Sequence, residues 1–553
     1  MRVRARIHGS RAGAASFLLL AFGALLGVGA KSVPPRVPGQ REVALHILNR
    51  LGFGPGPGDL DRVLEIGVAR YVDEQLHPGE IDDAAVERRL ADLGTLRMTT
   101  ADLIETFEKP IREARLLRRE ALRGQPMEPG EADDYRQMIP PSRRPRRIIE
   151  ELSTARVLRA VYSRRQLNEV LVDFWLNHFN VSAAKGLDRV FLTSFERDVV
   201  RPRIWGKFED LLMATAKSPA MLFYLDNARS VAEEANRRPV VRNRMRLFGA
   251  RPNAPTGINE NYARELMELH TLGVDGGYAQ KDVTELARAL TGWSIDRPGE
   301  GADFVFRAAM HDVGPKTVLG HAFPAGGGLD EGEMLIRILA HHPSTSHHVA
   351  YELAQRLVAD DPPKALVERA ARTFRAADGD LRETVRTIVE SPEFFDPAYF
   401  HSKVKSPFEY VVSAVRAVKG ETDARALVRE IAQMGEPLYL CQPPTGYGNT
   451  GSAWINNGAL VERMNFALAL TAGNVPGTAS DVEALIQPAE ARDPERSVEA
   501  LARVLTGGEL SCDTEATIAA RIGSAAGGPG ARAKAPLRLI AGLVLGSPDF
   551  QKE

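Results

Sequence analysis

Apolar residues recur at the spacing of an α-helix through most of this chain. Two stretches show the pattern most clearly, Arg164–Val181 and Gly257–Tyr278. In each stretch, apolar side chains three and four residues apart form a stripe that a helix would bury against its neighbours. The only convincing strand pattern is short and covers Phe304–Phe306 and Val318–Gly320. We therefore predict a mainly α protein, with a large multi-helical, bundle-like domain, one short β hairpin and a helical C-terminal part.

The helix predicted within Gly257–Tyr278 has clear signals for its start and its end. Asn259 is a good N-cap, because its side-chain oxygen can accept a backbone N–H that the first turn leaves free. Gly273 is a good stop, because glycine enters the left-handed conformation without steric cost. His270 ends the apolar stripe, so we expect its imidazole to face the interior.

Charged side chains occupy the other faces of this helix. Glu260, Arg264 and Glu268 are four residues apart and predict a ladder of alternating charges. Glu265 lies three residues before Glu268, so carboxylates are expected on the faces next to His270. In the alternative interpretation, these charges are solvated or hold neighbouring helices together.

His178 has a similar position in the helix predicted within Arg164–Val181. It ends the apolar face, next to a polar row that contains Asp173 and Asn177. Two helices that each direct a histidine inward beside acids could build a metal site or an acid–base pair. The ordinary alternative is a core histidine whose ring nitrogens bond to a carbonyl or a carboxylate. Neither helix has the HExxH spacing of a zinc site.

Further histidines lie outside these two helices. His311 and Asp312 follow the strand Phe304–Phe306 in a predicted loop, and loops on a rigid scaffold often carry catalytic side chains. We expect both residues to close the site. His347 and His348 fall in the first turn of a later helix, where adjacent residues do not face each other. For them we predict no more than incidental zinc affinity.

The first 30 residues have the composition of a signal peptide. Arginines at positions 2, 4, 6 and 11 precede the apolar run Ala14–Gly27, and Val28–Ala30 has the small residues of a cleavage site. We expect export to the periplasm or the extracellular space after cleavage near Ala30. The alternative is an uncleaved membrane anchor, although the apolar run is short for a span. No later stretch is long and apolar enough to cross a membrane.

Charge and cysteine content exclude a nucleic-acid-binding protein and a protein with covalently attached haem. Cleavage at Ala30 reduces the 71 basic residues to 67 against 72 acidic residues, so the net charge changes from −1 to −5. We therefore expect no nucleic-acid partner. Cys441 and Cys512 are the only cysteines. After export, the two cysteines could form one disulfide or remain two free thiols, and both alternatives stay open. A CxxCH motif is missing, so no haem is attached covalently.

The 523 residues after the predicted cleavage site exceed a usual single domain. We divide them into an N-terminal helical domain with the candidate site (41–330), a C-terminal helical domain (331–475) and a helical tail segment (476–553). The Arg-rich segment 109–147 and the loop 230–256 are either solvated surface or contacts for a partner.

Nine motifs occur in order along the chain. They are HILNRLGFGP (46–55), DFWLNHFNV (173–181), GKFEDLLMATAKSPAMLFYLDN (206–227), NENYARELMELHTLGVDGGY (259–278), DVTELARALTGW (282–293), HD…K…LG (311–320), DDPP (360–363), KSPFEYVVSAVRA (405–417) and PPTGY (443–447). Together they resemble the bacterial domain-of-unknown-function 1800 family. The resemblance covers roughly residues 41–475. It departs from the family at Ala279, where a threonine cap is expected, and in a longer Arg-rich insertion.

This resemblance implies an exported, mostly helical protein, and it provides no established activity. Genes of the family often lie beside those of a second exported, sulfatase-like family, which implies a possible sulfatase-like partner protein. The C-terminal half is also similar in style to helical proteins found beside c-type cytochromes.

We therefore predict an extracytoplasmic enzyme, metal-assisted or metal-free, that acts on a polymer or an envelope component. Its ligands, acid–base groups and orienting residues would be His178, His270, Glu265, Glu268, Arg264, Asp173, His311 and Asp312. A divalent metal would be bound by His178, His270 and Glu268, and no other cofactor is identified. The main alternative is a non-catalytic binding or assembly protein for the sulfatase-like partner. A metal- or haem-dependent redox protein is a third alternative.

Overall fold

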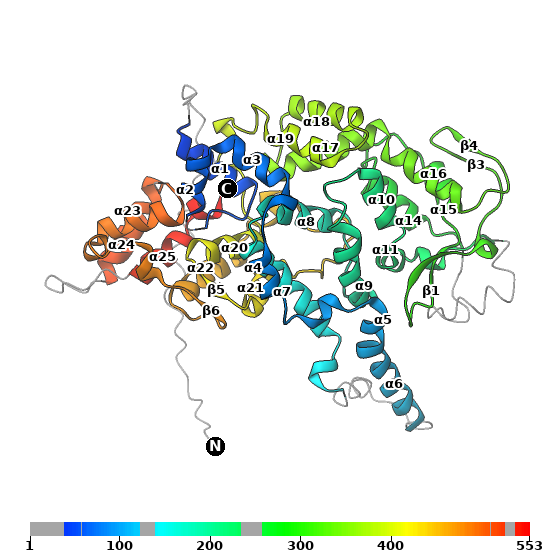
Figure 1. Ribbon diagram of the computed structural model, residues 1–553, viewed down its shortest axis with the longest axis horizontal. Coiled ribbons are helices and arrows are strands. Elements are labelled where there is room, and N and C mark those ends of the chain that lie inside the picture. Colours follow the sequence, from blue (N-terminus) through cyan, green and yellow to red (C-terminus); the bar gives the residue numbers. More distant parts are fainter. Residues whose placement is uncertain (1–37, 57, 122–138, 234–256, 509, 526–536) are drawn as a thin grey trace, which may run out of the picture. The chain divides into compact units, whose positions relative to one another are not determined.

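Helices make up 61% of the structure, which confirms the mainly α prediction (Figure 1). The computed structural model describes residues 38–56, 58–121, 139–233, 257–508, 510–525 and 537–553. Gly39–Glu553 forms one compact unit, and the domain boundaries expected at residues 330 and 475 stay a prediction. The expected signal peptide 1–30, most of the loop 230–256 and the middle of the segment 109–147 lie outside the described residues.

Three helices form the centre of the unit: α7 (Arg146–Tyr162), α8 (Gln166–His178) and α20 (Pro407–Ala417). α7 contacts both α8 and α20, and every residue of α20 is buried. The indole of Trp175 on α8 is 1% exposed. A helix that is covered on all sides needs neighbours on every face, so the remaining helices pack around this layer.

Two of the N-terminal helices contact the central layer directly. The bounds of the N-terminal helices are α1 (Gln40–Arg50), α2 (Asp59–Ile66), α3 (Val68–Leu76), α4 (Ala84–Arg89), α5 (Thr100–Leu103) and α6 (Lys109–Ala121). α3 contacts α8 and α4 contacts α7. α6 begins the Arg-rich segment and extends away from the central layer (Figure 1).

The helices of the middle of the chain include the second histidine helix. They are α9 (Asp188–Ser194), α10 (Phe208–Ala216), α11 (Pro219–Tyr224), α14 (Glu260–Glu268), α15 (Gln280–Ala289) and α16 (Leu329–Ala340). The Asn259 side chain caps α14 by accepting from the N–H groups of Asn261 and Tyr262, as predicted. Gly273 has the predicted positive φ of 81°, although α14 already ends at Glu268.

The short strands form three antiparallel pairs, whereas the sequence predicted one hairpin. The pairs are β1 (Trp293–Asp296) with β2 (Asp303–Phe306), β3 (Lys316–Val318) with β4 (His321–Phe323), and β5 (Glu421–Thr422) with β6 (Thr478–Ala479). Trp293, Ser294 and Ile295 are all buried, and the Ser294 hydroxyl bonds to the Ala228 carbonyl. The sequence of β1 does alternate apolar and polar residues, but the run is only four residues long, the shortest over which such a pattern marks a strand.

The described residues of the C-terminal half are mainly helical, as expected. Its helices are α17 (Pro343–Leu357), α18 (Lys364–Ala376), α19 (Leu381–Val389), α21 (Arg425–Gln433), α22 (Asn457–Thr471), α23 (Pro494–Leu505), α24 (Cys512–Ala525), α25 (Leu537–Leu545) and α26 (Pro548–Gln551). Both cysteines are free, Cys441 buried and Cys512 exposed. None of the helices in the described ranges has the length and apolar composition of a membrane span.

Candidate functional site

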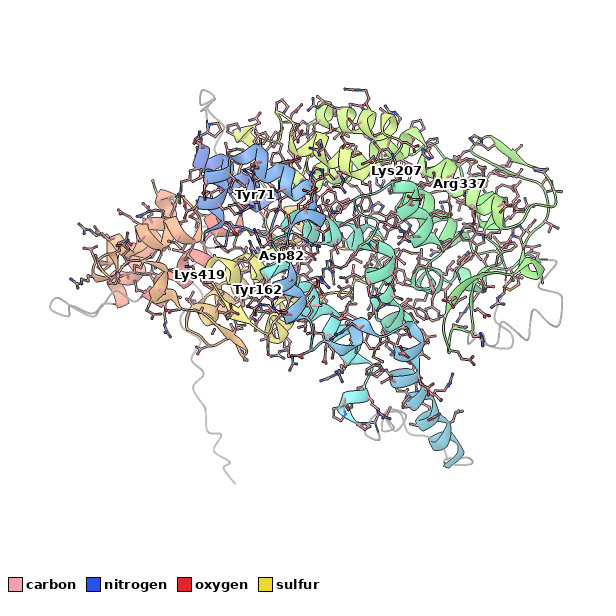
Figure 2. The ribbon with its side chains drawn as sticks, viewed as in Figure 1. Tyr71, Asp82, Tyr162, Lys207, Arg337 and Lys419 are labelled. Atoms are coloured by element: carbon pink, nitrogen blue, oxygen red, sulfur yellow. The ribbon has the colours of Figure 1, made fainter. Side chains whose placement is uncertain are left out.

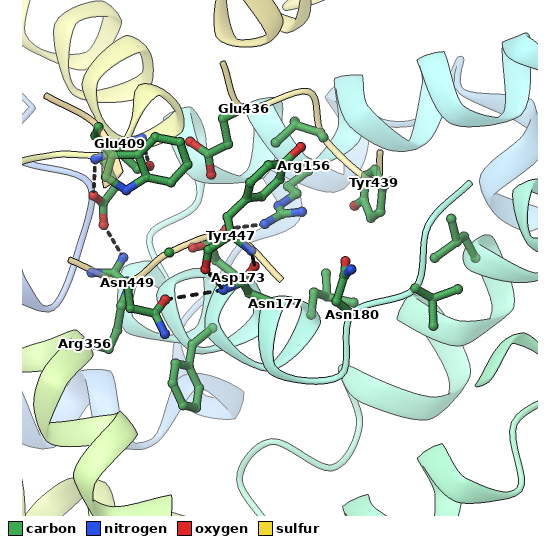
Figure 3. A pocket seen from close by; sticks show the side chains of 18 of the residues that line it. Arg156, Asp173, Asn177, Asn180, Arg356, Glu409, Glu436, Tyr439, Tyr447 and Asn449 are labelled. Carbon is green, nitrogen blue, oxygen red and sulfur yellow. Dashed lines mark hydrogen bonds and ion pairs between the residues drawn. The ribbon is translucent and has the colours of Figure 1, made fainter. Parts of the chain in front are cut away.

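A polar cavity lies where the central helices meet the segment between α21 and α22 (Figure 3). Its free volume is about 60 Å³. The polar residues that line it are Arg156, Asp173, Asn177, Asn180, Arg356, Lys403, Ser406, Glu409, Glu436, Tyr439, Tyr447 and Asn449. Ion-forming side chains at a buried position require partners, because leaving an isolated charge out of water is costly. The concentration of charged and polar side chains makes this cavity a candidate site.

Three of the sequence motifs meet at the cavity. DFWLNHFNV contributes Asp173, Asn177 and Asn180, KSPFEYVVSAVRA contributes Ser406 and Glu409, and PPTGY contributes Tyr447. Asp173 and Asn177 are four residues apart on α8, so their side chains share one face of that helix. Motifs separated by more than 200 residues in sequence thus supply one cavity.

Asp173 forms an ion pair with Arg156 of α7 (Figure 3). The Arg156 guanidinium lies 5.2 Å from the ring centres of both Phe408 and Tyr439, which adds cation–π attraction. The side chains of Arg156 and Asp173 are 11% and 18% exposed. Asp173 was predicted as a site residue from its polar row, and the structure places it at the cavity.

Glu436 is a buried carboxyl group beside this ion pair. One of its oxygens, Oε2, accepts the backbone N–H of Phe408 at 2.8 Å. Burial, and after it the negative charge of Asp173, raises the pKa of Glu436 to about 8. Glu436 is therefore protonated at neutral pH, and it can donate a proton where most carboxyl groups cannot.

Glu409 has the opposite environment on α20. It pairs with Arg356 at 2.5 Å and accepts the N–H of Ser406 at 2.7 Å. Burial alone would raise the pKa of Glu409, but Arg356 and the Ser406 N–H outweigh it and hold the pKa below its usual value. The cavity thus contains a protonated carboxyl group and an ionised one.

Lys403 lines the same cavity. Its Nζ donates to Asp360 Oδ1 at 2.7 Å and to the Asn449 carbonyl at 3.2 Å. Burial lowers the pKa of Lys403 in spite of the Asp360 carboxylate. Asp360 belongs to the DDPP motif, so a fourth motif supports the cavity from behind.

Two asparagines hold the segment 441–449 over the cavity. Asn177 donates to the Tyr447 carbonyl at 2.9 Å and accepts the Tyr447 N–H at 2.7 Å. Asn180 donates to the Pro443 carbonyl at 2.7 Å. Gly446 has a φ of 70°, and a Cβ there would lie 2.5 Å from the Asn177 carbonyl oxygen. The close approach requires glycine.

His178 and His270 lie close together, but neither lines the cavity. Their ring centres are 6.0 Å apart. His178 Nδ1 is 2.6 Å from Glu352 Oε2, and His178 Nε2 is 3.3 Å from the His270 carbonyl oxygen. A third ring, that of His348, lies 6.2 Å from His178 and bonds to the Leu269 carbonyl. A carboxylate and a carbonyl thus satisfy the ring of His178, and a carbonyl satisfies the ring of His348, as in ordinary core histidines.

His270 is 2% exposed, and its Nε2 has no hydrogen-bond partner within the described structure. Burial, followed by the nearby His178 and His348, keeps the pKa of His270 well below its ordinary value. His270 is therefore neutral at physiological pH.

His311 and Asp312 belong to a separate polar cluster, so they do not close a site around His178. His311 Nε2 is 2.8 Å from Glu331 Oε1, and Lys316 Nζ is 2.7 Å from the same oxygen. Asp312 accepts from Arg288 of α15 at 3.0 Å. These buried contacts fix the β3–β4 pair to α15 and α16. The predicted loop position is correct, but His311 is only 5% exposed.

Two charged residues of α14, Glu260 and Arg264, contact side chains of α15. Arg264 donates to Gln280 at 2.6 Å, and Glu260 accepts from Gln280 and Thr284. Of the predicted ladder of Glu260, Arg264 and Glu268, the first two members therefore bond to side chains of α15.

The remaining carboxylates of α14 also lie outside a metal site. Glu268 accepts the Tyr278 hydroxyl at 3.0 Å, so it does not join His178 and His270. Burial and the neighbouring Glu268 raise the pKa of Glu265. Across the described ranges, no group of three or more His, Cys, Asp or Glu side chains is placed to hold a metal ion.

Sequence reasoning missed Glu436, Glu352, Arg156 and Lys403. The sequence did contain a signal for Asn177 and Asn180 as site residues, since both belong to the DFWLNHFNV motif. Glu436 lies in a turn between Gly435 and Pro437, and nothing in that turn distinguishes it from an exposed acid. Only the packing of α8 and α20 buries it.

A larger open groove lies at the other ends of the same helices, with a volume of about 800 Å³. Figure 2 labels four of its lining residues, Tyr71, Asp82, Tyr162 and Lys419. Charged residues make up about half of its lining, and some of them are paired, for example Arg62 with Glu74 at 2.5 Å. Its size is in the range of ligand pockets.

The comparisons with known proteins give one match. A family model described as "Protein of unknown function (DUF1800)" matches residues 46–552, nearly the whole chain. No curated protein and no solved structure matches the chain.

Proposed function

The chain belongs to the DUF1800 family of proteins of unknown function, and we propose that it is an acid–base enzyme whose site is the cavity between α7, α8 and α20. The observation that carries this proposal is Glu436, a buried carboxyl group with a pKa of about 8 beside the ion-paired Asp173. Neighbouring carboxyl groups with opposed environments are the usual arrangement of an acid with a base.

In this mechanism, Glu436 donates a proton to the leaving atom of the substrate. Asp173, which is paired with Arg156, accepts a proton from the attacking water, and this proton then passes back to Glu436 through solvent, so that both carboxyl groups return to their starting state before the next cycle. Arg356, which is 7% exposed, is placed to stabilise negative charge that develops in the reaction. A hydrolytic cleavage fits this set of groups. As substrate we propose a polymer or an envelope component outside the cytoplasm, in keeping with the expected signal peptide.

The experiment uses the chain from Lys31 onward and panels of chromogenic esters, glycosides and amides. For the substrate that is turned over, Glu436→Gln should lower kcat by about a hundredfold or more, the usual contribution of a positioned general acid. Turnover should also fall as pH rises through about 8, because Glu436 then loses its proton.

Glu430→Gln is the matched control, because Glu430 lies six residues before Glu436 and does not line the cavity. It should leave kcat unchanged. Full turnover in Glu436→Gln, or no turnover of any substrate class by the unmodified chain, would contradict the proposal.

The open groove favours a second candidate, a binding protein for an exported sulfatase-like partner. Lys419 is exposed at the groove and has no ion-pair partner among the described residues. If the groove is the interface, Lys419→Glu should abolish a complex with such a partner in analytical ultracentrifugation. An intact complex would exclude the groove as the interface.

A further inference from the structure

The cavity lining has more positive than negative charge at neutral pH. Its cations are Arg156, Arg356 and Lys403, and its carboxyl groups are Asp173, Glu409 and Glu436. Because Glu436 is protonated below about pH 8, two carboxylates face three cations. Outside the lining, the Asp360 carboxylate pairs with Lys403 at 2.7 Å and partly neutralises its charge.

Donor groups around the cavity have unused hydrogen-bonding capacity. Lys403 Nζ has three N–H groups and uses two of them, for Asp360 and for the Asn449 carbonyl. Arg356 makes one close contact, with Glu409 at 2.5 Å, and reaches Glu553 only at 3.9 Å. Within the described structure, Arg156 Nε is buried without a hydrogen-bond partner. A buried donor without an acceptor is costly, and Arg156 Nε is one, so an acceptor in the cavity would be favoured there.

The free volume limits the size of that acceptor. About 60 Å³ corresponds to roughly four to six water molecules at about 10–15 Å³ each. A carboxylate, phosphate or sulfate group has a suitable number of heavy atoms, whereas a sugar ring or a peptide unit with its side chain is too large. The rest of a larger substrate would lie outside the cavity.

We propose that the cavity binds an oxyanion group, a carboxylate, phosphate or sulfate, through Lys403, Arg356 and Arg156. This inference rests on the proposed function in one respect, since it names the end group of the substrate on which Glu436 acts. Lysine and arginine are the side chains that bind such groups, and arginine can do so with two parallel N–H donors. Asn177 and Asn180 hold the segment 441–449 that carries Asn449 next to Lys403.

The test measures sulfate binding by isothermal titration calorimetry at pH 7 and constant ionic strength, with the whole exported chain. Sulfate does not change its charge between pH 6 and 9, so it is the reference probe. Binding of inorganic phosphate and of acetate is measured in the same way. The anion that binds most tightly of the three identifies which oxyanion group the cavity prefers. We expect binding of one anion per chain.

Lys403→Gln should weaken sulfate binding by about tenfold or more, the effect of losing a hydrogen bond to a charged group. Its fold should persist, because the Asp360 carboxylate that it leaves is partly hydrated. Lys207→Gln is the matched control: Lys207 also faces a partly exposed aspartate, Asp380 at 3.8 Å, and it lies outside the cavity (Figure 2). This control should bind sulfate normally.

Sulfate binding should also weaken between pH 7 and 9, as Glu436 becomes negative. The groups that face Glu436 are Arg156 on α7, Asp173 on α8, Arg356 on α17, Ser406 before α20, Arg463 on α22, and Cys441 and Tyr447 on the segment between α21 and α22. Glu436→Gln should reduce this pH dependence.

Failure of the inference and failure of the proposed function give different results. If no oxyanion binds, or if Lys403→Gln binds sulfate as well as Lys207→Gln does, the anion site is wrong even when Glu436→Gln is inactive. If sulfate binds as expected but Glu436→Gln keeps full turnover, the anion site stands and the acid–base assignment is wrong.

Discussion

At the scale of single residues, burial decides what each ionisable group can do. Glu436 and Glu409 are both buried glutamates at one cavity, yet their pKa values move in opposite directions. The difference comes from partners: Glu409 has Arg356 at 2.5 Å, while Glu436 has Asp173 as its neighbour. The same rule applies to His270, whose burial beside two other imidazoles favours the neutral ring.

Because His270 is neutral in the folded protein, we predict that the free energy of unfolding decreases at acidic pH. Its folded pKa is lowered, so the unfolded chain binds the proton more tightly, and stability is lost as pH falls below the ordinary value of about 6.5. In His270→Gln, the loss of unfolding free energy between pH 7 and pH 5 should be smaller by up to about 2 kcal/mol. Urea denaturation at the two pH values measures this. His77→Gln, at an exposed ring, should keep the pH dependence of the parent chain. Equal pH dependence in all three chains would exclude His270 as the source.

At the scale of elements, the segment 441–449 depends on one glycine. Gly446 combines a φ of 70° with a backbone approach that leaves no space for a Cβ beside Asn177. Gly473, at the end of α22, has a similar φ of 75°, but a Cβ there would meet no atom within 4 Å. A comparison of alanine substitutions at the two positions therefore separates the effect of conformational strain from that of a steric clash.

Gly446→Ala should lower the melting temperature more than Gly473→Ala does. Strain at positive φ costs about 1–2 kcal/mol at both positions, and the clash with Asn177 adds to it only at Gly446. Differential scanning calorimetry gives the comparison. If the two variants melt at the same temperature, the contact between Gly446 and Asn177 does not hold this segment in place.

At the scale of the whole molecule, the expected export stays a prediction. Residues 1–30 lie outside the described residues, and the first described helix, α1, begins at Gln40. Expression of the full chain in a secreting bacterium should yield a mature protein that starts at Lys31, as N-terminal sequencing would show. Replacing the arginines at positions 2, 4, 6 and 11 by glutamates should retain the precursor in the cell. Recovery of the intact chain in the membrane fraction would favour the uncleaved anchor instead.

The sequence by itself determined the mainly α class, because helical spacing of apolar residues depends only on local order along the chain. It also determined the cap of α14 at Asn259, which acts within one turn. It also identified Asp173 as a candidate site residue, since a polar row on an otherwise apolar helix is visible without a structure, and Asp173 lines the cavity.

Only the tertiary structure decided which polar residues share a site. His178 and Asp173 are on the same helix, yet Asp173 faces the cavity and His178 faces Glu352 of α17. The pKa of Glu436 is raised by burial and by Asp173, which lies on α8, more than 200 residues earlier in the sequence. The physical reason is that desolvation and charge pairing depend on neighbours in space, which periodicity along the chain does not specify.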